Sequence, residues 1–155
     1  MLLTHGKEHS MITVSASNAT ETIAIGIEPG EMLLESIQAA CREHDIRSGM
    51  VVSGIGTLKT CTMHYVTHTN FPPTDRLYTI EKPIEVLSIS GLIADGKPHL
   101  HMQVSVGEHE TYGGHLESGC EVLYLAEVGI LKCNGLAITR RPDPERGVVL
   151  LRSSE

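Results

Sequence analysis

Only one stretch of this sequence has the hydrophobic period of a helix, and nearly every other apolar segment alternates with period two. In that stretch, Leu33, Ile37, Ala40 and Cys41 recur at the spacing of one helix face. We therefore predict one principal amphipathic helix at about residues 30–45. A single helix among many strands predicts an α+β fold built mostly on an antiparallel β-sheet.

The strands are predicted from apolar alternation between turn-forming residues. The tetrapeptide Ala94-Asp95-Gly96-Lys97 has the composition of a tight hairpin turn. The dipeptide Gly113-Gly114 is expected to form a second turn, because glycine allows the backbone to bend sharply. Among the segments predicted as strands are 22–27, 60–67, 83–93, 99–106 and about 120–131.

Length and composition indicate one globular domain. The chain has 155 residues, of which 41% are hydrophobic and 20% charged, and this balance is typical of a folded protein. There is no Trp and only one Phe, so the core must be largely aliphatic. We expect a polar N-terminal arm at residues 1–10 and a single domain at 11–155.

Charge and the absence of long apolar runs argue against several classes of protein. Lys and Arg number 12 and Asp and Glu number 19, so the formal net charge is −7, which disfavours direct binding to nucleic acid. No apolar run is long enough to cross a membrane, and the first residues do not resemble a signal peptide. We expect a cytoplasmic protein. The four cysteines form no CxxC pair and are expected to be reduced, mostly core residues: Cys41, Cys61, Cys120 and Cys133.

Histidines form the most distinctive pattern of polar residues. In the segment 99–106, period-two alternation places His99 and His101 on one face and the apolar residues on the other. The expected bend at Gly113-Gly114 would return His115 toward this pair. Three imidazoles with one open position are a common catalytic zinc arrangement. All three must be neutral to bind a metal ion, so affinity is expected to fall below about pH 6.

The same pattern has a simpler interpretation, in which the three histidines are polar residues on a hydrated sheet face. The remaining histidines, His64 among them, show no comparable grouping. Two carboxylates also interrupt apolar segments, Glu85 and Glu127. Glu127 is either a general base or histidine-orienting group, or an outward residue or subunit contact, whereas the outward interpretation is favoured for Glu85.

The order of several motifs resembles the PPC domain, the "plants and prokaryotes conserved" domain. The resemblance covers roughly residues 10 to 133. It rests on the segments 28–37, 53–58, 83–91, 99–101, 112–116 and 126–128. It implies an α+β fold on an antiparallel sheet and a homotrimer.

The plant form of the family follows an AT-hook and works in nuclear DNA-binding proteins, but this sequence has no Arg-Gly-Arg-Pro motif. The stand-alone prokaryotic form is the closer comparison. The domain is also similar in fold to acetolactate decarboxylase, which holds zinc with an HxH pair and a later histidine. That order is reproduced by His99, His101 and His115, although the gap to the third histidine differs.

Two functions follow from the sequence. The first is a homotrimeric protein with a zinc or other divalent metal site at His99, His101 and His115 that binds or processes a small molecule, with Glu127 moving protons. The second is a non-enzymatic oligomerisation or regulatory module that acts through protein partners and contacts DNA only indirectly. The sequence leaves open whether the protein is an enzyme.

Overall fold

In the part of the chain that the structure describes, the fold is one antiparallel sheet with a single helix on one of its faces and a small separate hairpin. It was obtained as a computed structural model, which describes residues 14–16 and 20–154. The elements in chain order are β1 (Thr20–Ile27), α1 (Leu33–Glu43), β2 (Ser48–Val66), β3 (Asp75–Ala94), β4 (Lys97–Val106), β5 (Glu110–Leu116), β6 (Val122–Cys133), β7 (Ile138–Asp143) and β8 (Val148–Ser153). The predicted α+β class is confirmed. The expected arm at 1–10 lies outside the described residues.

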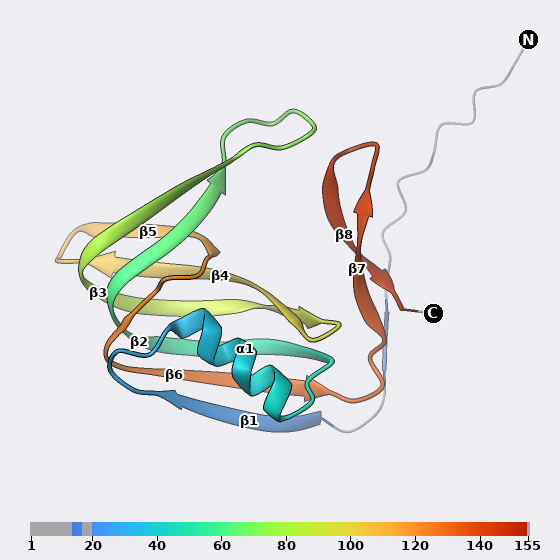
Figure 1. Ribbon diagram of the computed structural model, residues 1–155, viewed down its shortest axis with the longest axis horizontal. Helices are drawn as coiled ribbons and strands as arrows, with labels where there is room; N and C mark the ends of the chain where they lie inside the picture. The colour runs from blue at the N-terminus through green and yellow to red at the C-terminus, as the bar shows by residue number, and fades with distance from the viewer. Residues whose placement is uncertain (1–13, 17–19, 155) are drawn as a thin grey trace, which may run out of the picture.

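The six strands of the main sheet lie in the order β1-β6-β2-β3-β4-β5, with every pairing antiparallel (Figure 1). The far end of β2 also pairs with β5, so the sheet curls until strands β2 to β5 close on themselves. This closure protects the edge of β5 over part of its length. It also brings together segments that are about fifty residues apart in the chain.

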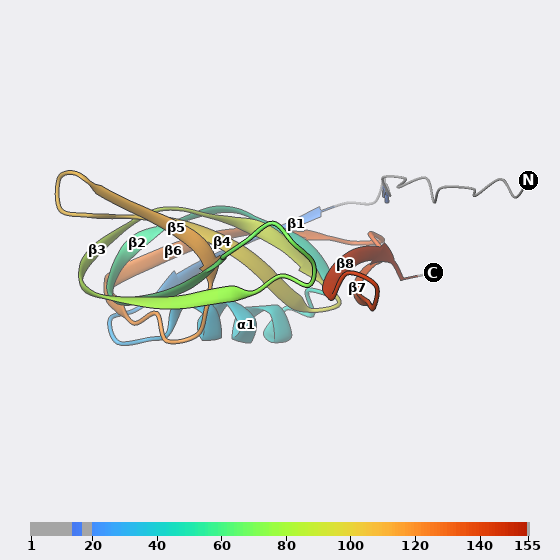
Figure 2. The ribbon, with the colours of Figure 1, turned by 90° about the horizontal axis from the view of Figure 1, so that it is seen from above.

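Helix α1 packs against one face of the sheet, and Figure 2 shows it alone on that side of the main sheet. Its apolar stripe is buried, as the sequence predicted. The helix is shorter than the expected 30–45, because Met32 is extended immediately before it and Asp45 adopts a left-handed φ of 47° after it. A left-handed residue breaks the run of helical hydrogen bonds. No helix among the described residues is long and apolar enough to cross a lipid bilayer.

The buried core lies on the face of the sheet that α1 covers, here called the inner face. In β4, Leu100, Met102 and Val104 are buried on the inner face, whereas His99 and His101 are exposed on the opposite, outer face. The predicted alternation is therefore confirmed. The described cysteines are all free thiols, and Cys41, Cys61 and Cys120 are buried, as expected of core residues.

The hairpin predicted at Asp95-Gly96 is confirmed, since both residues have left-handed φ angles and join β3 directly to β4. The turn predicted at Gly113-Gly114 is wrong. Both glycines lie inside β5, and the chain turns earlier, at residues 107–109. Gly114 is needed for a different reason. A Cβ atom there would lie 2.6 Å from the backbone oxygen of His64 on β2, so glycine permits β5 to approach β2 closely.

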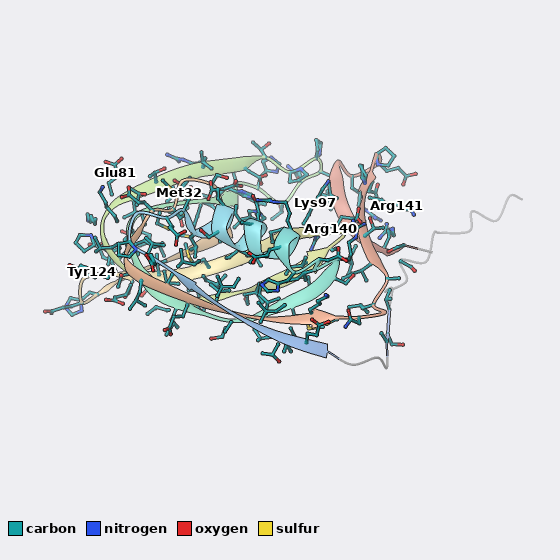
Figure 3. The ribbon with its side chains drawn as sticks, turned by 60° about the horizontal axis from the view of Figure 1, so that its bottom comes forward. Met32, Glu81, Lys97, Tyr124, Arg140 and Arg141 are labelled. Atoms are coloured by element: carbon teal, nitrogen blue, oxygen red, sulfur yellow. The ribbon has the colours of Figure 1, made fainter. Side chains whose placement is uncertain are left out.

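Hairpin β7–β8 packs beside the turn between β3 and β4. Arg140 of β7 donates hydrogen bonds of 3.0 Å to the backbone oxygens of both Lys97 and Leu92. Figure 3 shows Arg140 beside Lys97, with Arg141 pointing to the other side of the hairpin. These two bonds fix the end of the β3–β4 hairpin, from which His99 projects.

Candidate metal centre

Strand register brings the three predicted histidines together on the outer face. His99 and His101 project from β4, and His115 of β5 lies directly opposite His101. Cross-strand neighbours on one face lie about 5 Å apart at Cβ, which suits a shared ligand. The three histidines therefore meet as the sequence predicted, but for a different reason. His115 arrives through antiparallel pairing of β4 with β5, with no bend at the glycines.

The ring nitrogens of these histidines have the spacing of a metal site. One nitrogen from each ring lies within 4.8 Å of the other two. A common centre therefore lies within about 2.8 Å of each nitrogen (4.8 Å divided by √3), against about 2.0–2.1 Å for a zinc–nitrogen bond. Within the described residues, none of the three rings has a hydrogen-bond partner, so these nitrogens are available as ligands. A divalent ion fits this donor set if small side-chain rotations bring the three ring nitrogens slightly closer together.

Burial favours the neutral imidazoles that metal binding requires. It lowers the pKa of His115 to about 4, and the nearby imidazoles of His64 and His99 act in the same direction. The side chain of His99 is exposed on one side, but its partial desolvation by the neighbouring side chains lowers its pKa, and the positive charge of Arg140 acts in the same direction. A neutral ring keeps a lone pair on one nitrogen, so these two histidines stay competent to bind a cation at pH values below the pKa of a free histidine side chain.

A fourth histidine completes the cluster, contrary to the expectation that His64 stands apart. His64 of β2 lies directly opposite His115, and their rings stack with centroids 4.5 Å apart. The Nδ1 atom of His64 lies 2.6 Å from the Oε1 atom of Glu117, and its Nε2 atom lies 3.7 Å from a carboxylate oxygen of Asp75. His64, His115 and Glu117 also have ligand atoms within 4.8 Å of one another, so a second ion position would share His115.

A sequence signal for this fourth histidine existed, but it was not sufficient. His64 follows the buried Met63 in an alternating strand, so the pattern places it on the outward face. The same reasoning places His99 and His101 outward. The local pattern does not indicate that β2 lies beside β5, because His64 and His115 are 51 positions apart in the chain. The contact follows from closure of the sheet, which is a non-local property.

The structure does not bring Glu127 to the histidines. Glu127 is exposed on the outer face of β6, opposite Gly26 of β1 and Ile55 of β2. Strands β2 and β3 lie between β6 and β4. Its catalytic role stays a prediction, and Glu127 belongs to neither group of side chains whose ligand atoms meet at His115. Glu85 is exposed, as expected.

Comparison with known proteins identifies a family over most of the chain. Residues 14–134 match the model of the Plants and Prokaryotes Conserved (PCC) domain. A curated relative, the bifunctional protein GlmU of Synechococcus sp. (strain JA-3-3Ab), is 28% identical over 123 residues, which cover 79% of this chain and 19% of that protein. The chain thus spans about a fifth of the length of the curated relatives it matches.

Solved structures share the fold. A plant- and prokaryote-conserved protein from Pyrococcus horikoshii has a TM-score of 0.77 and 27% identity, with 91% of this chain and 98% of that chain covered. A metal-containing protein from Archaeoglobus fulgidus has a TM-score of 0.78 and 24% identity, covering 92% and 100%. A protein from Bacteroides thetaiotaomicron described as a putative DNA-binding protein has a TM-score of 0.75 and 19% identity, covering 92% and 99%.

Proposed function

The chain belongs to the Plants and Prokaryotes Conserved domain family, and from that premise we propose that it binds a divalent metal ion, zinc first, to bind or process a small molecule. The ligands are His99, His101 and His115. The observation that carries the proposal is the convergence of three ring nitrogens, none with a hydrogen-bond partner among the described residues. The metal-containing relative from Archaeoglobus fulgidus supports a metal site in this fold.

Three protein ligands leave a position for a small molecule. Three imidazoles with one open position are typical of catalytic zinc sites, where the ion supplies a Lewis acid that polarises a carbonyl or lowers the pKa of water. His99 and His101 are exposed, so a ligand reaches the site from the outer face. This access distinguishes the proposed site from a structural zinc site, which is closed by four protein ligands.

Glu117 and His64 are proposed as positioning residues. The short contact between Glu117 Oε1 and His64 Nδ1 fixes the His64 ring, and that ring stacks on His115. Stacking restricts the rotation of His115 about its side-chain bonds. Groups that orient a metal ligand in this way raise affinity by reducing the disorder that binding must remove.

A homotrimer is proposed as the assembly. Besides the family resemblance, four exposed apolar side chains of β2 and β6, here called the apolar patch, support association, since apolar side chains exposed together mark contact sites. The patch consists of Met50, Val52, Ile55 and Leu125, each between 38% and 55% exposed. The same patch favours the second candidate function, a non-enzymatic oligomerisation module that acts through protein partners. Glu127 lies beside the patch, so assembly through the patch is the way in which Glu127 of one subunit would approach the histidines of another.

The deciding experiment is metal analysis of protein purified without a histidine tag. We expect about one zinc or other divalent ion per chain, and loss of that ion in the His101→Ala variant. The matched control is His109→Ala, because His109 lies in the turn before β5 and its side chain is 90% exposed. Native protein that takes up no metal, even when zinc is supplied, would leave only the oligomerisation module.

A further inference from the structure

A polar hollow lies beside the proposed metal centre on the outer face. It has a volume of about 360 Å³, and His101 forms one side of it. Ser90 of β3 lies opposite His101, and Ser88 lies opposite Gln103. Across β5, His101 faces His115 and Gln103 faces Gly113. The hollow therefore begins at His101, one of the three proposed ligands, and extends to the next cross-strand row, which contains Gln103.

The floor of the hollow is open because position 113 lacks a side chain. Gly113 and His115 lie two residues apart on β5, so a side chain at 113 would project on the same outer face. A Cβ atom there would lie 3.3 Å from the backbone oxygen of Met102 and 3.6 Å from Gln103 Cγ. Gly114, in contrast, is required by the close approach of β2. Gly113 thus contributes room beside the metal centre.

The polar groups of the hollow carry no formal charge apart from the titratable ring of His101. The Ser88 hydroxyl donates to Gln103 Oε1 over 3.5 Å, which leaves the amide nitrogen of Gln103 directed at no other group among the described residues. The Ser90 hydroxyl likewise has no hydrogen-bond partner in the described part of the chain. Together these side chains offer donors and acceptors within one row of the metal ligands.

We propose that this hollow is a subsite for an uncharged, hydroxyl-bearing part of a small molecule whose other end is an oxygen-donor group bound at the three histidines. The inference rests on the proposed metal site and names the class of ligand for it. An anionic tail is disfavoured because the hollow has no cationic partner such as Lys or Arg. An apolar tail is disfavoured because it would displace water from Ser90 and Gln103 without replacing those hydrogen bonds.

The test uses three hydroxamates on protein loaded with Co²⁺, whose visible spectrum reports binding. Acetohydroxamate has the metal-binding head alone, whereas glycolohydroxamate and propionohydroxamate extend it by a hydroxyl and a methyl group of similar size. We expect the native protein to prefer glycolohydroxamate over propionohydroxamate by about three- to tenfold, the effect of one or two hydrogen bonds. The Ser90→Ala/Gln103→Met variant should lose this preference and bind acetohydroxamate as the native protein does.

Two control variants sharpen the result. Ser105→Ala changes a serine on the same face of β4 but outside the hollow, and it should keep the preference. Gly113→Ala adds a methyl group to the floor of the hollow. This variant should bind both extended hydroxamates more weakly, relative to acetohydroxamate, than the native protein does. Because the preference is compared between variants, the intrinsic affinities of the hydroxamates for cobalt cancel.

The outcomes separate the two proposals. Protein that gives no cobalt spectrum overturns the metal site and the subsite together. Protein that binds cobalt and all three hydroxamates with no hydroxyl preference, or keeps its preference in Ser90→Ala/Gln103→Met, retains the metal site. In that case the hollow is only hydrated surface, and the inference is overturned.

Discussion

The outer face of the sheet has two regions with opposite chemistry. Around β4, β5 and the far end of β2 it carries four histidines and a carboxylate, held by stacking and by one short hydrogen bond. Over β1, β6 and the near end of β2 it carries the apolar patch and Glu127, which forms no group with the histidines. Strand β4 in the first region alternates strictly, whereas β2 in the second region departs from period two at register shifts such as the one between Val51 and Ser53. Within a regular strand, alternation sets which residues face outward, and the strand neighbours decide what those residues can do.

The largest difference between the two regions is expected in metal affinity. His101→Ala removes one of three ligands, so we expect affinity for zinc to fall by more than about 100-fold, since even partners outside the ligand shell contribute about 10- to 100-fold. Glu127→Gln in the other region should leave affinity unchanged. Competition with a chromophoric chelator measures both. Circular dichroism should show that His101→Ala stays folded, because the core lies on the other side of β4.

A loss of zinc binding in Glu127→Gln equal to that in His101→Ala would break the comparison. It would mean that an assembly brings the two regions together, with Glu127 of one copy at the histidines of another. The separation of the regions would then hold for the single chain only.

Assembly should depend on the apolar region. If Val52 lies at a subunit contact of the proposed trimer, the carboxylate of Val52→Asp would be buried there, so we expect this variant to be monomeric at micromolar concentration. The control is Val149→Asp, because Val149 of β8 is 57% exposed and Val52 is 55% exposed, but Val149 lies outside the patch. Light scattering gives the mass of each. A native protein that is already monomeric contradicts the assembly proposed here.

A smaller effect is expected from the positioning residue. Glu117→Ala should weaken zinc binding by about three- to tenfold, because His64 and then His115 lose their fixed orientation. Glu117→Gln should restore most of the affinity, since its amide oxygen can still accept from Nδ1 of His64. Equal losses in the alanine and glutamine variants would indicate that Glu117 acts through its charge or as a ligand.

The histidine region should also make the stability of the protein depend on pH, through the lowered pKa of His115. The folded chain holds the pKa of His115 at about 4, mainly through burial, whereas the pKa of a free histidine side chain is 6.5. Between these values the unfolded chain binds more protons than the folded one, so stability of the metal-free protein falls as the pH drops from about 6.5 to about 4. His115→Gln should flatten this dependence in urea unfolding experiments. An unchanged pH profile would show that other groups cause the acid loss.

The lowered pKa of His115 and of His99 also changes the expected pH dependence of metal binding. Reference histidines predict a loss of affinity below about pH 6, whereas desolvation of His115 and His99 lowers the pKa of each and moves their protonation to lower pH. Zinc titrations between about pH 5 and about pH 7 should therefore show a shallower decline than three independent free imidazoles would give.

The smallest effect is expected with duplex DNA, because the chain carries a net negative charge. With a net charge of −7, the chain should show no salt-sensitive binding to duplex DNA in fluorescence anisotropy between about 50 and about 200 mM salt. The relative described as a putative DNA-binding protein is only 19% identical and shares the fold alone. Sub-micromolar binding that weakens steeply with salt would contradict this expectation.

Local pattern alone determined much of this protein. The single amphipathic helix, the hairpin at Asp95-Gly96 and the outward direction of His99 and His101 depend on residues within one element. Backbone periodicity places such residues on a face without reference to the rest of the chain. The order of the motifs was specific enough to indicate the family, because each motif is a continuous segment of the chain.

Tertiary structure alone decided which outward residues meet. His115 joins His101 through the register of β5 on β4, and His64 joins them only because β2 closes onto β5. Glu127 has the same outward parity as His101 but lies on a strand separated from it by two others. Strand order and register arise from contacts between distant segments, so a local period can place a side chain on a face but cannot choose its neighbours.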